Sequence, residues 1–515
     1  MKWRVILVLL LVILLAAWMS AAVEKSLSLQ ECLHIALKNN IALGIKVAQA
    51  ERKQGLLQQA KEKFLPALNC ALGKSKTNTP SASWIEAEDQ ISASSGALTA
   101  QLDQALWLGG QLTIGIDSSR YDSNERFQTI NPSYNCTVAI KWVQPLLRDG
   151  GDRISRREII IARNNRNISD NDLKTTLNET VCRIEELYWN LVYAERNLDV
   201  KKKSMQLAED LLTKNRRMAE LGLLAEIEIL SAEAEVASRR AEILDAQALR
   251  DNTGDELRSL LNETDDSVIR PTDEPRSDEQ TVDLEDCLNQ ALAYRPDFVS
   301  AAINLKSKEL ELDFAKNQLL PTLDLTAQYW SPGISGDRLI YKDNDPFGGE
   351  VIDIIPGGSS DALKDALDFR YRNWSVYLSL GIPLNSVFSH GAVHAARMDR
   401  REAELLRQDL ERQIRLEVMT AARTVGSDFQ RIHAYRTSRE LAERRMTAEE
   451  KRLAVGMSTS FIVLQYQRDY AQALSSEVRA LSDYNLALAR LEKAKGTILQ
   501  AKGIVFSEAI IEPAR

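Results

Sequence analysis

An internal repeat constrains the fold more than any other feature of this 515-residue chain. Residues 29–37 (LQECLHIAL) match residues 284–292 (LEDCLNQAL) at an offset of 255 positions. The same offset holds without a gap as far as the Leu-Pro pairs at 65–66 and 320–321. A gapless match over about forty positions is hard to obtain by chance, so the sequence indicates a tandem duplication. Each half is expected to build the same order of elements.

A second pair of matching segments lies further along each half. Residues 221–230 correspond to residues 455–464 at an offset of 234, so the first half carries extra residues between the two anchors. Residues 262–281 are rich in Asp, Glu, Thr and Pro and are predicted to be a polar linker. The predicted organisation is a signal peptide (1–22), a first repeat (23–261), the linker, a second repeat (282–500) and a C-terminal tail (501–515).

The first 22 residues read as a secretory signal. A basic start is followed by a short apolar run and by small residues, with cleavage expected after Ala22. No later segment approaches 18 uninterrupted apolar residues, so no further segment is predicted to cross a membrane as a helix. Entry into a membrane would then require a closed β-barrel, because lipid offers no hydrogen-bond partner to the backbone.

Heptad patterns predict very long helices. No proline interrupts residues 153–219, and a helix of that extent would be about 100 Å long at 1.5 Å per residue. Its apolar seam recurs every seven residues at Leu177, Ile184, Leu191, Leu198, Met205 and Leu212. The following helix carries a seam at Ile227, Leu230, Ala234, Ala237, Ala241, Leu244 and Ala248. Such seams are typical of coiled coils, and the second half repeats the pattern around Ile414 and Ala471.

Each half also carries alternating, strand-like segments. The opening helices, predicted over 28–64 and 283–319, end before a proline, and return strands follow at 134–145 and 374–383. The hairpin formed by 97–106 and 111–120 has strand patterning too, but its place inside or outside the barrel is open. Two strands per half give four per chain, too few to close a barrel. The sequence therefore predicts a cyclic homo-oligomer, in which three copies would supply twelve strands.

These features resemble the TolC, or outer membrane factor, family. The resemblance rests on the duplicated Leu-x-x-Cys-Leu-x-x-Ala-Leu helix ending in Leu-Pro, the strand ending Gly-Ile-Pro-Leu at 381–384, the segment 144–150 and the glycine turn at 222. It covers nearly all of residues 27–500. It implies a mainly α fold with β-barrel strands. Long coiled-coil hairpins form a periplasmic α-barrel, and four or more strands per protomer join a shared transmembrane β-barrel.

The resemblance also implies a function. The chain would be the outer-membrane channel of a tripartite efflux or type I secretion system, a passive exit duct for substrates driven by an inner-membrane pump. The implied partners are two further copies in a homotrimer, a periplasmic adaptor protein, a pump of the RND or ABC type and outer-membrane lipid. A periplasmic coiled-coil scaffold or adaptor that never inserts is the alternative. Trp142, Trp330 and Trp374 near the strand ends favour insertion.

By the same analogy the two helix–helix turns, 219–230 and 453–464, form the periplasmic tip that docks the adaptor and closes the pore. The candidate residues are Gly222, Glu226, Glu228, Gly456 and Ile462. The family commonly has Asp six residues after the turn glycine, where this chain has Glu228 in one half and Ile462 in the other. Rings of glutamates in a narrow pore would favour cations. The simpler alternatives are solvent-facing glutamates and glycines that only cap helices.

No other chemistry is indicated. The net charge of −8 argues against a nucleic-acid partner, and no nucleotide loop, paired-acid site or nucleophile arrangement suggests an enzyme or a cofactor. His390 and His394 are spaced i, i+4, but nothing nearby completes a metal site. The five cysteines match no zinc pattern and read as small buried residues, with a disulfide left open. They are Cys32, Cys70, Cys136, Cys182 and Cys287.

Overall fold

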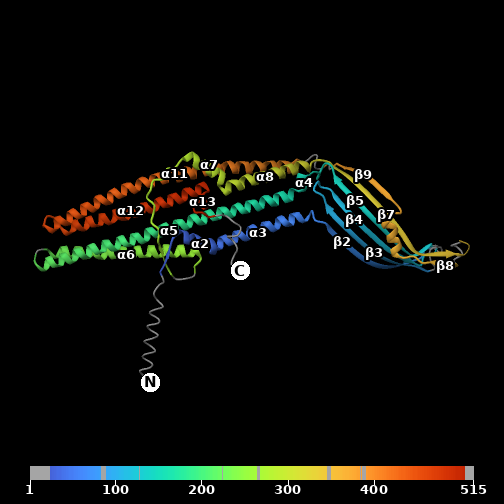
Figure 1. Cartoon of the computed structure of the whole chain (residues 1–515), viewed down its shortest axis with the longest axis horizontal. Coiled ribbons are helices and arrows are strands. Elements are labelled where there is room, and N and C mark those ends of the chain that lie inside the picture. Colours follow the sequence, from blue (N-terminus) through green and yellow to red (C-terminus); the bar gives the residue numbers. More distant parts are fainter. Residues whose placement is uncertain are drawn as a thin grey trace, which may run out of the picture. The chain divides into compact units, whose positions relative to one another are not determined.

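The computed structural model (Figure 1) describes residues 24–82, 89–126, 128–222, 224–263, 267–344, 350–382, 384 and 390–504. The predicted signal peptide and most of the predicted tail lie outside these residues. The chain divides into two compact units. The helical unit comprises Met1–Glu51, Asn167–Ala302 and Leu405–Arg515, and the sheet unit comprises Arg52–Arg166 and Ile303–Glu404. The predicted repeat boundaries stay predictions.

Four helices of the first half have counterparts of the same length in the second half. Those of the first half are α2 (Leu29–Asn39), α3 (Ile41–Glu62), α4 (Asp152–Ser155), α5 (Arg157–Glu220) and α6 (Glu226–Leu261). Those of the second half are α7 (Leu284–Tyr294), α8 (Pro296–Asn317), α9 (Ser359–Leu367), α11 (Gly391–Ala454), α12 (Ser460–Lys495) and α13 (Ile498–Ala501). The repeated pairs contain 11, 22, 64 and 36 residues in both halves. The duplication read from the sequence is therefore present in the helices.

Each opening helix is broken, where the sequence predicted a single helix. The breaks fall at Asn40 and Arg295, whose backbones are extended. The side-chain oxygen of Asn40 accepts a hydrogen bond from the Leu43 N–H (3.1 Å) and so caps the helix that follows. Arg295 precedes Pro296, whose ring disfavours helical geometry in the residue before it. The prediction of continuous helices was wrong at these two places.

The long helices pair as two hairpins, α5 with α6 and α11 with α12 (Figure 1). The predicted seam of α5 is confirmed, with Met205 half-buried and the other five residues buried. The predicted seam of α6 is exposed along its whole length. The helix instead buries Ala232, Arg239 and Ala246, which are also spaced by seven residues. Two heptad stripes run along α6, and the described part of the chain covers only the one formed by Ala232, Arg239 and Ala246.

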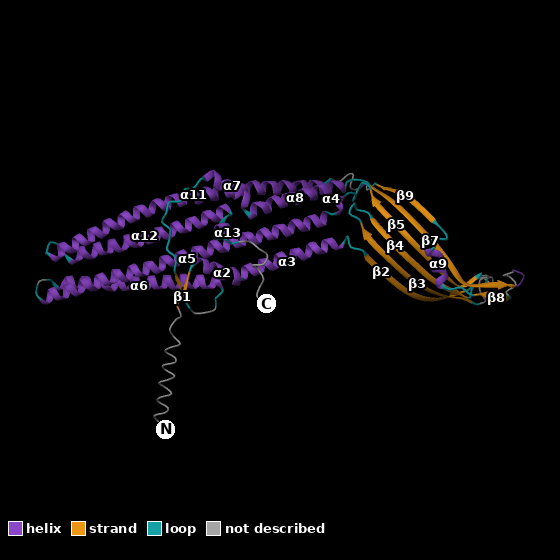
Figure 2. Ribbon diagram, in the orientation of Figure 1, coloured by secondary structure: helices purple, strands orange, loops and turns teal. Residues whose placement is uncertain are grey.

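Strands form two sheets (Figure 2). A small parallel pair joins β1 (Glu24–Leu27) to β6 (Val268–Pro271), which lies inside the predicted linker. The large antiparallel sheet contains β2 (Ala67–Pro80), β3 (Gln90–Ala105), β4 (Gln111–Ser123), β5 (Ile130–Pro145), β7 (Thr322–Tyr341), β8 (Val351–Ile355) and β9 (Asn373–Gly381). Its order is β2-β3-β4-β5-β7, with β9 and the short β8 both pairing with β7. No described helix combines the length and the apolar character that a membrane-spanning helix needs.

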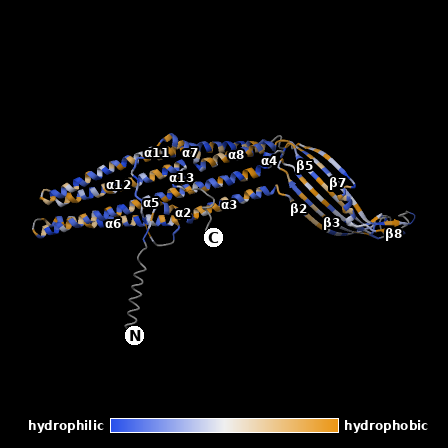
Figure 3. Cartoon of the chain, viewed as in Figure 1, coloured by the Kyte–Doolittle hydropathy of each residue, from blue (hydrophilic) through white to orange (hydrophobic). Residues whose placement is uncertain are grey.

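The hairpin whose place the sequence left open lies inside the sheet. Strand β3 pairs with β2, and β4 pairs with β5, so the hairpin lies between β2 and β5 in the sheet. The described part of the sheet thus contains six long strands, which agrees with the expectation of four or more per chain. Alternation along a strand shows which face each residue occupies but not which strand will pair with it. Figure 3 shows apolar and polar residues mixed along each of these strands.

Candidate functional site

The two hairpin turns of the helical unit have closely similar backbones. Gly222 and Gly456 adopt φ of +71° and +75°, the left-handed region that favours glycine. In the second turn the Gly456 N–H donates to the Leu453 carbonyl (3.0 Å) and the Met457 N–H to the Arg452 carbonyl (2.9 Å). An added Cβ would meet no atom within 4 Å at either glycine. The requirement for glycine is therefore conformational, as expected of a helix C-cap.

The residues that follow the turns differ between the halves. Glu226 and Glu228 lie in the first turn of α6, where the peptide dipoles favour negative charge and no side chain caps the helix. Glu226 is exposed, whereas Glu228 is half-buried and one of its carboxylate oxygens is buried without a hydrogen-bond partner. In α12 the Thr459 hydroxyl accepts the N–H of Ile462 (3.5 Å), and Ile462 is half-buried. One half uses charge at this helix start and the other uses a side-chain cap.

A small apolar core joins the two hairpins just behind the turns. Its members come from α5, α6 and α12: Ala208, Leu211, Leu212, Ala232, Val463 and Leu464. Beside it the Ser460 hydroxyl donates to the side-chain oxygen of Asn215 (3.0 Å), and both residues are buried. The Asn215 amide in turn donates to the Glu228 carbonyl (3.4 Å). The structure thus brings candidate residues of the two halves onto one packed end of the helical unit.

A buried arginine ties the same three helices together. The Arg239 guanidinium donates to Glu235 (2.9 Å), to the Ser204 carbonyl and hydroxyl (both 2.7 Å) and to the Leu464 carbonyl (3.3 Å). Arg468 of α12 donates to the same Glu235 carboxylate. Burial alone would raise the pKa of Glu235, but the hydrogen bonds from Arg468 and Arg239 outweigh it and lower that pKa.

Sequence reasoning missed this network. Charged residues along a helix usually face solvent, and the i, i+4 spacing of Glu235 and Arg239 was the only available signal. The network spans both halves of the chain, so a single-sequence pattern could not reveal it.

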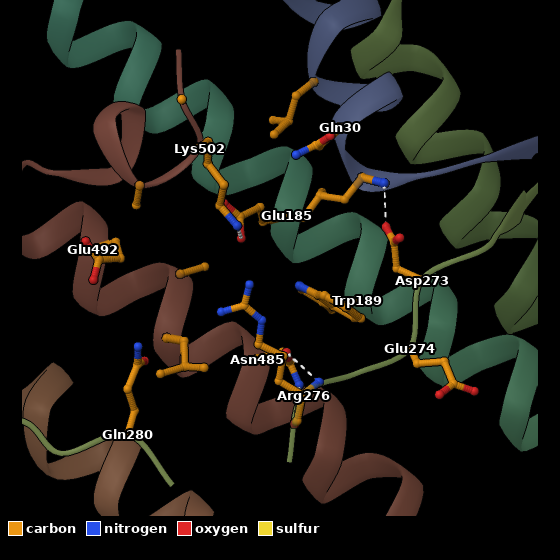
Figure 4. Close-up of a pocket in the computed structure, with 16 residues that line it drawn as sticks. Gln30, Glu185, Trp189, Asp273, Glu274, Arg276, Gln280, Asn485, Glu492 and Lys502 are labelled. Atoms are coloured by element: carbon orange, nitrogen blue, oxygen red, sulfur yellow. Dashed lines mark hydrogen bonds and ion pairs between the residues drawn. The ribbon is translucent and has the colours of Figure 1, made fainter. Parts of the chain in front are cut away.

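A polar cavity of about 580 Å³ lies elsewhere in the helical unit (Figure 4). It is lined by residues of α2, α5, α12, the segment between the halves and the end of the described chain. Glu185 is buried at its wall, with one carboxylate oxygen paired with Lys502 (2.8 Å) and the other without a partner. Burial raises the pKa of Glu185. Asp273 accepts the Leu29 N–H (2.7 Å), so the cavity lining also fixes the start of α2.

Metal-ligating and thiol side chains lie apart from one another in the part of the chain that the structure describes. Among the described residues no group of three or more His, Cys, Asp or Glu side chains is placed to hold a metal ion. All five cysteines are described and none is disulfide-bonded; four are buried and Cys70 is exposed. Burial raises the pKa of Cys32 to about 12 and that of Cys182 to about 11. These two thiols therefore stay protonated and serve as packing groups.

Comparison with known proteins gives concordant results. Residues 287–497 match the family model described as outer membrane efflux protein. Residues 287–497, within the second half of the chain, therefore carry an outer membrane efflux protein domain. No curated protein matches it by sequence.

Solved structures of outer-membrane channels share the fold of this chain. The outer-membrane channel OprN is 17% identical with a TM-score of 0.64, covering 91% of this chain and 90% of its own. VceC from Vibrio cholerae is 15% identical with a TM-score of 0.62, covering 91% and 96%. MtrE from Neisseria gonorrhoeae, in an open state, is 17% identical with a TM-score of 0.59, covering 92% and 89%. The expected TolC-like fold is confirmed.

The efflux protein domain at residues 287–497 indicates the location and the broad role of the chain. It is an outer-membrane protein with a long periplasmic helical portion, and a transport channel rather than an enzyme. The five candidate residues all lie at the two turns of its helical unit. Their roles are taken up below.

Proposed function

We propose that this protein is the exit duct of a tripartite export system, in which three copies form one passive channel. An inner-membrane pump of the RND or ABC type supplies the energy, and a periplasmic adaptor connects pump and channel. The efflux protein domain at residues 287–497 and the fold shared with solved outer-membrane channels support the channel.

The exposed stripe on α6 carries the proposal of self-association. Ile227, Leu230 and Leu244 are 66%, 60% and 62% exposed, although they lie on one heptad face. Four alanines complete this face: Ala234, Ala237, Ala241 and Ala248. Small residues on a heptad stripe allow a second helix to approach closely. A second copy of the chain supplies helices of the same length, so the stripe suits a helix of the neighbouring protomer.

The two turns suit a protein partner at the same end. Large apolar side chains outside the α6 stripe are exposed beside each turn glycine: Leu221 in the first half, and Val455, Met457 and Phe461 in the second. Exposed apolar groups gathered at one end of a soluble unit mark an interaction surface. We assign Gly222 and Gly456 to the shape of this adaptor-docking tip, with Ile462 packed beneath it. Glu226 and Glu228 would form acidic rings around the pore in a three-fold assembly.

The test combines oligomeric mass with conductance. Protein extracted from outer membranes should run as a trimer and give discrete, cation-preferring steps in a planar bilayer. The double variant Glu226→Gln/Glu228→Gln should lose most of the cation preference and keep the trimer. Glu209→Gln, an exposed site further back on α5, serves as the matched control and should behave as wild type.

Two other outcomes have distinct meanings. Cation preference that survives the double variant would reject the acidic rings and leave the channel intact. A folded, water-soluble monomer that never inserts would reject the duct and favour the periplasmic scaffold.

A further inference from the structure

The sheet carries a continuous apolar row that crosses all six long strands. Following the pairing register from β2 to β9, one residue per strand, the row reads Leu68, Leu102, Ile114, Ile140, Tyr329 and Trp374. Paired residues in neighbouring strands point to the same face of a sheet. Strands β3 and β4 therefore contribute to this face in the same way as the strands that the family resemblance led us to expect.

The adjacent row is polar and points the other way. One step along each strand gives Ala67, Asp103, Thr113, Lys141, Gln328 and Ser375. On this face the Asp103 carboxylate accepts hydrogen bonds from Thr113 (2.7 Å), Asn69 (3.0 Å) and Gln111 (3.3 Å). A sheet with one apolar and one polar face, alternating residue by residue, is the pattern of a membrane barrel with an aqueous interior.

The hairpin is also anchored at its turn. The Gln104 amide at the end of β3 donates to the Phe64 carbonyl (2.7 Å), beyond the end of α3. The Leu108 carbonyl in the turn accepts the Gly151 N–H (3.0 Å) and the Gln144 amide (3.0 Å). Gly109 sits so close to the Asp149 carbonyl that an added Cβ would lie 2.4 Å from it. The turn is therefore built into the base of the sheet, beside the ends of the flanking strands.

Helix α9 packs on the apolar face over β5 and β7. Ala362 and Ala366 bury Cys136 and Val138, and Gly333 leaves room for the helix backbone. The outer side of the helix exposes Leu363 and Leu367. Ser360, Asp361 and Lys364 are exposed beside them, so the outer side of α9 is mixed in polarity.

The sheet ends in two open edges. Among the described strands, β2 pairs only with β3 and β9 pairs only with β7, so each presents backbone groups without a strand partner on its other side. An unpaired edge is not tolerated in lipid, where every backbone group needs a partner. Because the six long strands alternate in direction, β9 of one chain lies antiparallel to β2 of a second copy. A further copy of this chain therefore closes the edge without any change of pattern.

We propose that the β3–β4 hairpin is part of the membrane wall, so that three copies of this chain close an eighteen-stranded barrel with the apolar face toward lipid. The proposal rests on the trimeric channel proposed above and adds its wall and its width. Barrel diameter grows roughly linearly with strand number. The eighteen-stranded barrel, which forms the outer mouth of the channel, is therefore about half as wide again as a twelve-stranded one. Barrels of this size leave an open aqueous channel, which suits bulky export substrates.

Single cysteines on the two faces test the proposal in the intact protein. In a Cys70→Ala background, Leu102→Cys and Ile114→Cys probe the apolar face of the hairpin. Gln101→Cys and Thr113→Cys probe its polar face. A charged maleimide should label the apolar-face cysteines at least about tenfold more slowly than the polar-face ones, because lipid disfavours the thiolate. A bimane label should show the reverse order in its quenching by brominated phospholipid.

Ile140→Cys and Lys141→Cys on β5 separate this proposal from the channel itself. If labelling is slow on the apolar face and fast on the polar face of β3 and β4 as well as of β5, each copy contributes six strands to the barrel. Alternation on β5 with uniformly fast labelling of β3 and β4 overturns it, and the channel stands with a smaller barrel. Fast labelling at all six positions means that the sheet is not in a membrane, which would reject the channel as well.

Discussion

The two halves of the chain agree in their helices and differ in their strands. Each long helix contains 64 residues in both halves, whereas the first half places four long strands in the sheet and the second places two. One residue added to a helix turns every later side chain by about 100°, which would destroy a heptad seam. An antiparallel hairpin adds two strands and brings the chain back to the same end of the sheet with its direction unchanged. Length is therefore constrained in the helices and adjustable in the sheet.

The largest expected effect comes from removing the difference between the two sets of strands. Deletion of residues 90–123 takes out β3, its turn and β4, and leaves β2 free to pair with β5. The trimer should survive, and its outer mouth should narrow by about a third. Exclusion of sized poly(ethylene glycol) added from the extracellular side measures this width. Deletion of residues 351–355, which removes only β8, is the control and should leave the width unchanged; an equal width in both deletions would contradict the account.

The next prediction makes one helix more like its counterpart. Arg239 is buried, and the equivalent position at the offset of 234 holds Ala473. Arg239→Ala leaves the buried Ser204 hydroxyl and carbonyl without their donor and leaves Glu235 with Arg468 as its remaining partner. The variant should cost about 3 kcal/mol of unfolding free energy. Thermal unfolding followed by circular dichroism measures the loss. Arg240→Ala, at the exposed neighbouring position, should cost little, and equal losses in the two variants would show that the network contributes nothing specific.

A third prediction concerns the buried acid that has no counterpart. Position 419, equivalent to Glu185, holds Met419. Because burial raises the pKa of Glu185 above its ordinary value of 4.5, folding favours the protonated form. The stabilisation from this group is complete below pH 4.5 and is lost as the pH rises through the raised pKa of the folded protein. The unfolding temperature of Glu185→Gln should therefore rise relative to that of the wild type as the pH increases through this window.

The matched control for that series is Glu256→Gln, on the exposed surface of α6. Its unfolding temperatures should run parallel to those of the wild type across the pH range. If the unfolding temperatures of Glu185→Gln also ran parallel to those of the wild type, folding would not raise the pKa of Glu185.

The smallest effects should come from the turns, where the two halves agree. Gly222→Ala and Gly456→Ala force a side chain into the left-handed region and should each destabilise by about 1 kcal/mol. Gly426→Ala, inside α11 with open space around its Cβ position, should instead stabilise by about 1 kcal/mol. Chemical denaturation of the three variants measures both signs. Destabilisation at only one of the two turns would show that the turns are not equivalent.

The sequence predicted the helical frame well because its signals are local and repeated. The seam from Leu177 to Leu212 is buried as the heptads indicated, and the turn glycines stand where the duplication placed them. Strands β5 and β9 were also recognised from alternation. The break at Arg295 was visible in the following proline, although the sequence was read as one helix.

The parts that could not be predicted depend on partners that a single sequence does not name. The α6 stripe from Ile227 to Ala248 has the pattern of a seam, but the pattern does not tell whether the covering helix belongs to the same chain. The position of β3 and β4 depends on strand pairing, which alternation leaves open. The burial of Arg239 arises from residues more than two hundred positions away, such as Leu464.

The most direct test of the central claim is an image of the wild-type protein extracted from the outer membrane, resolved well enough to count strands in cross-section. The account predicts three copies and eighteen strands, with β3 and β4 in the wall and β9 of each copy beside β2 of the next. Twelve wall strands with the β3–β4 hairpin outside, or a chain that remains a monomer, would contradict it.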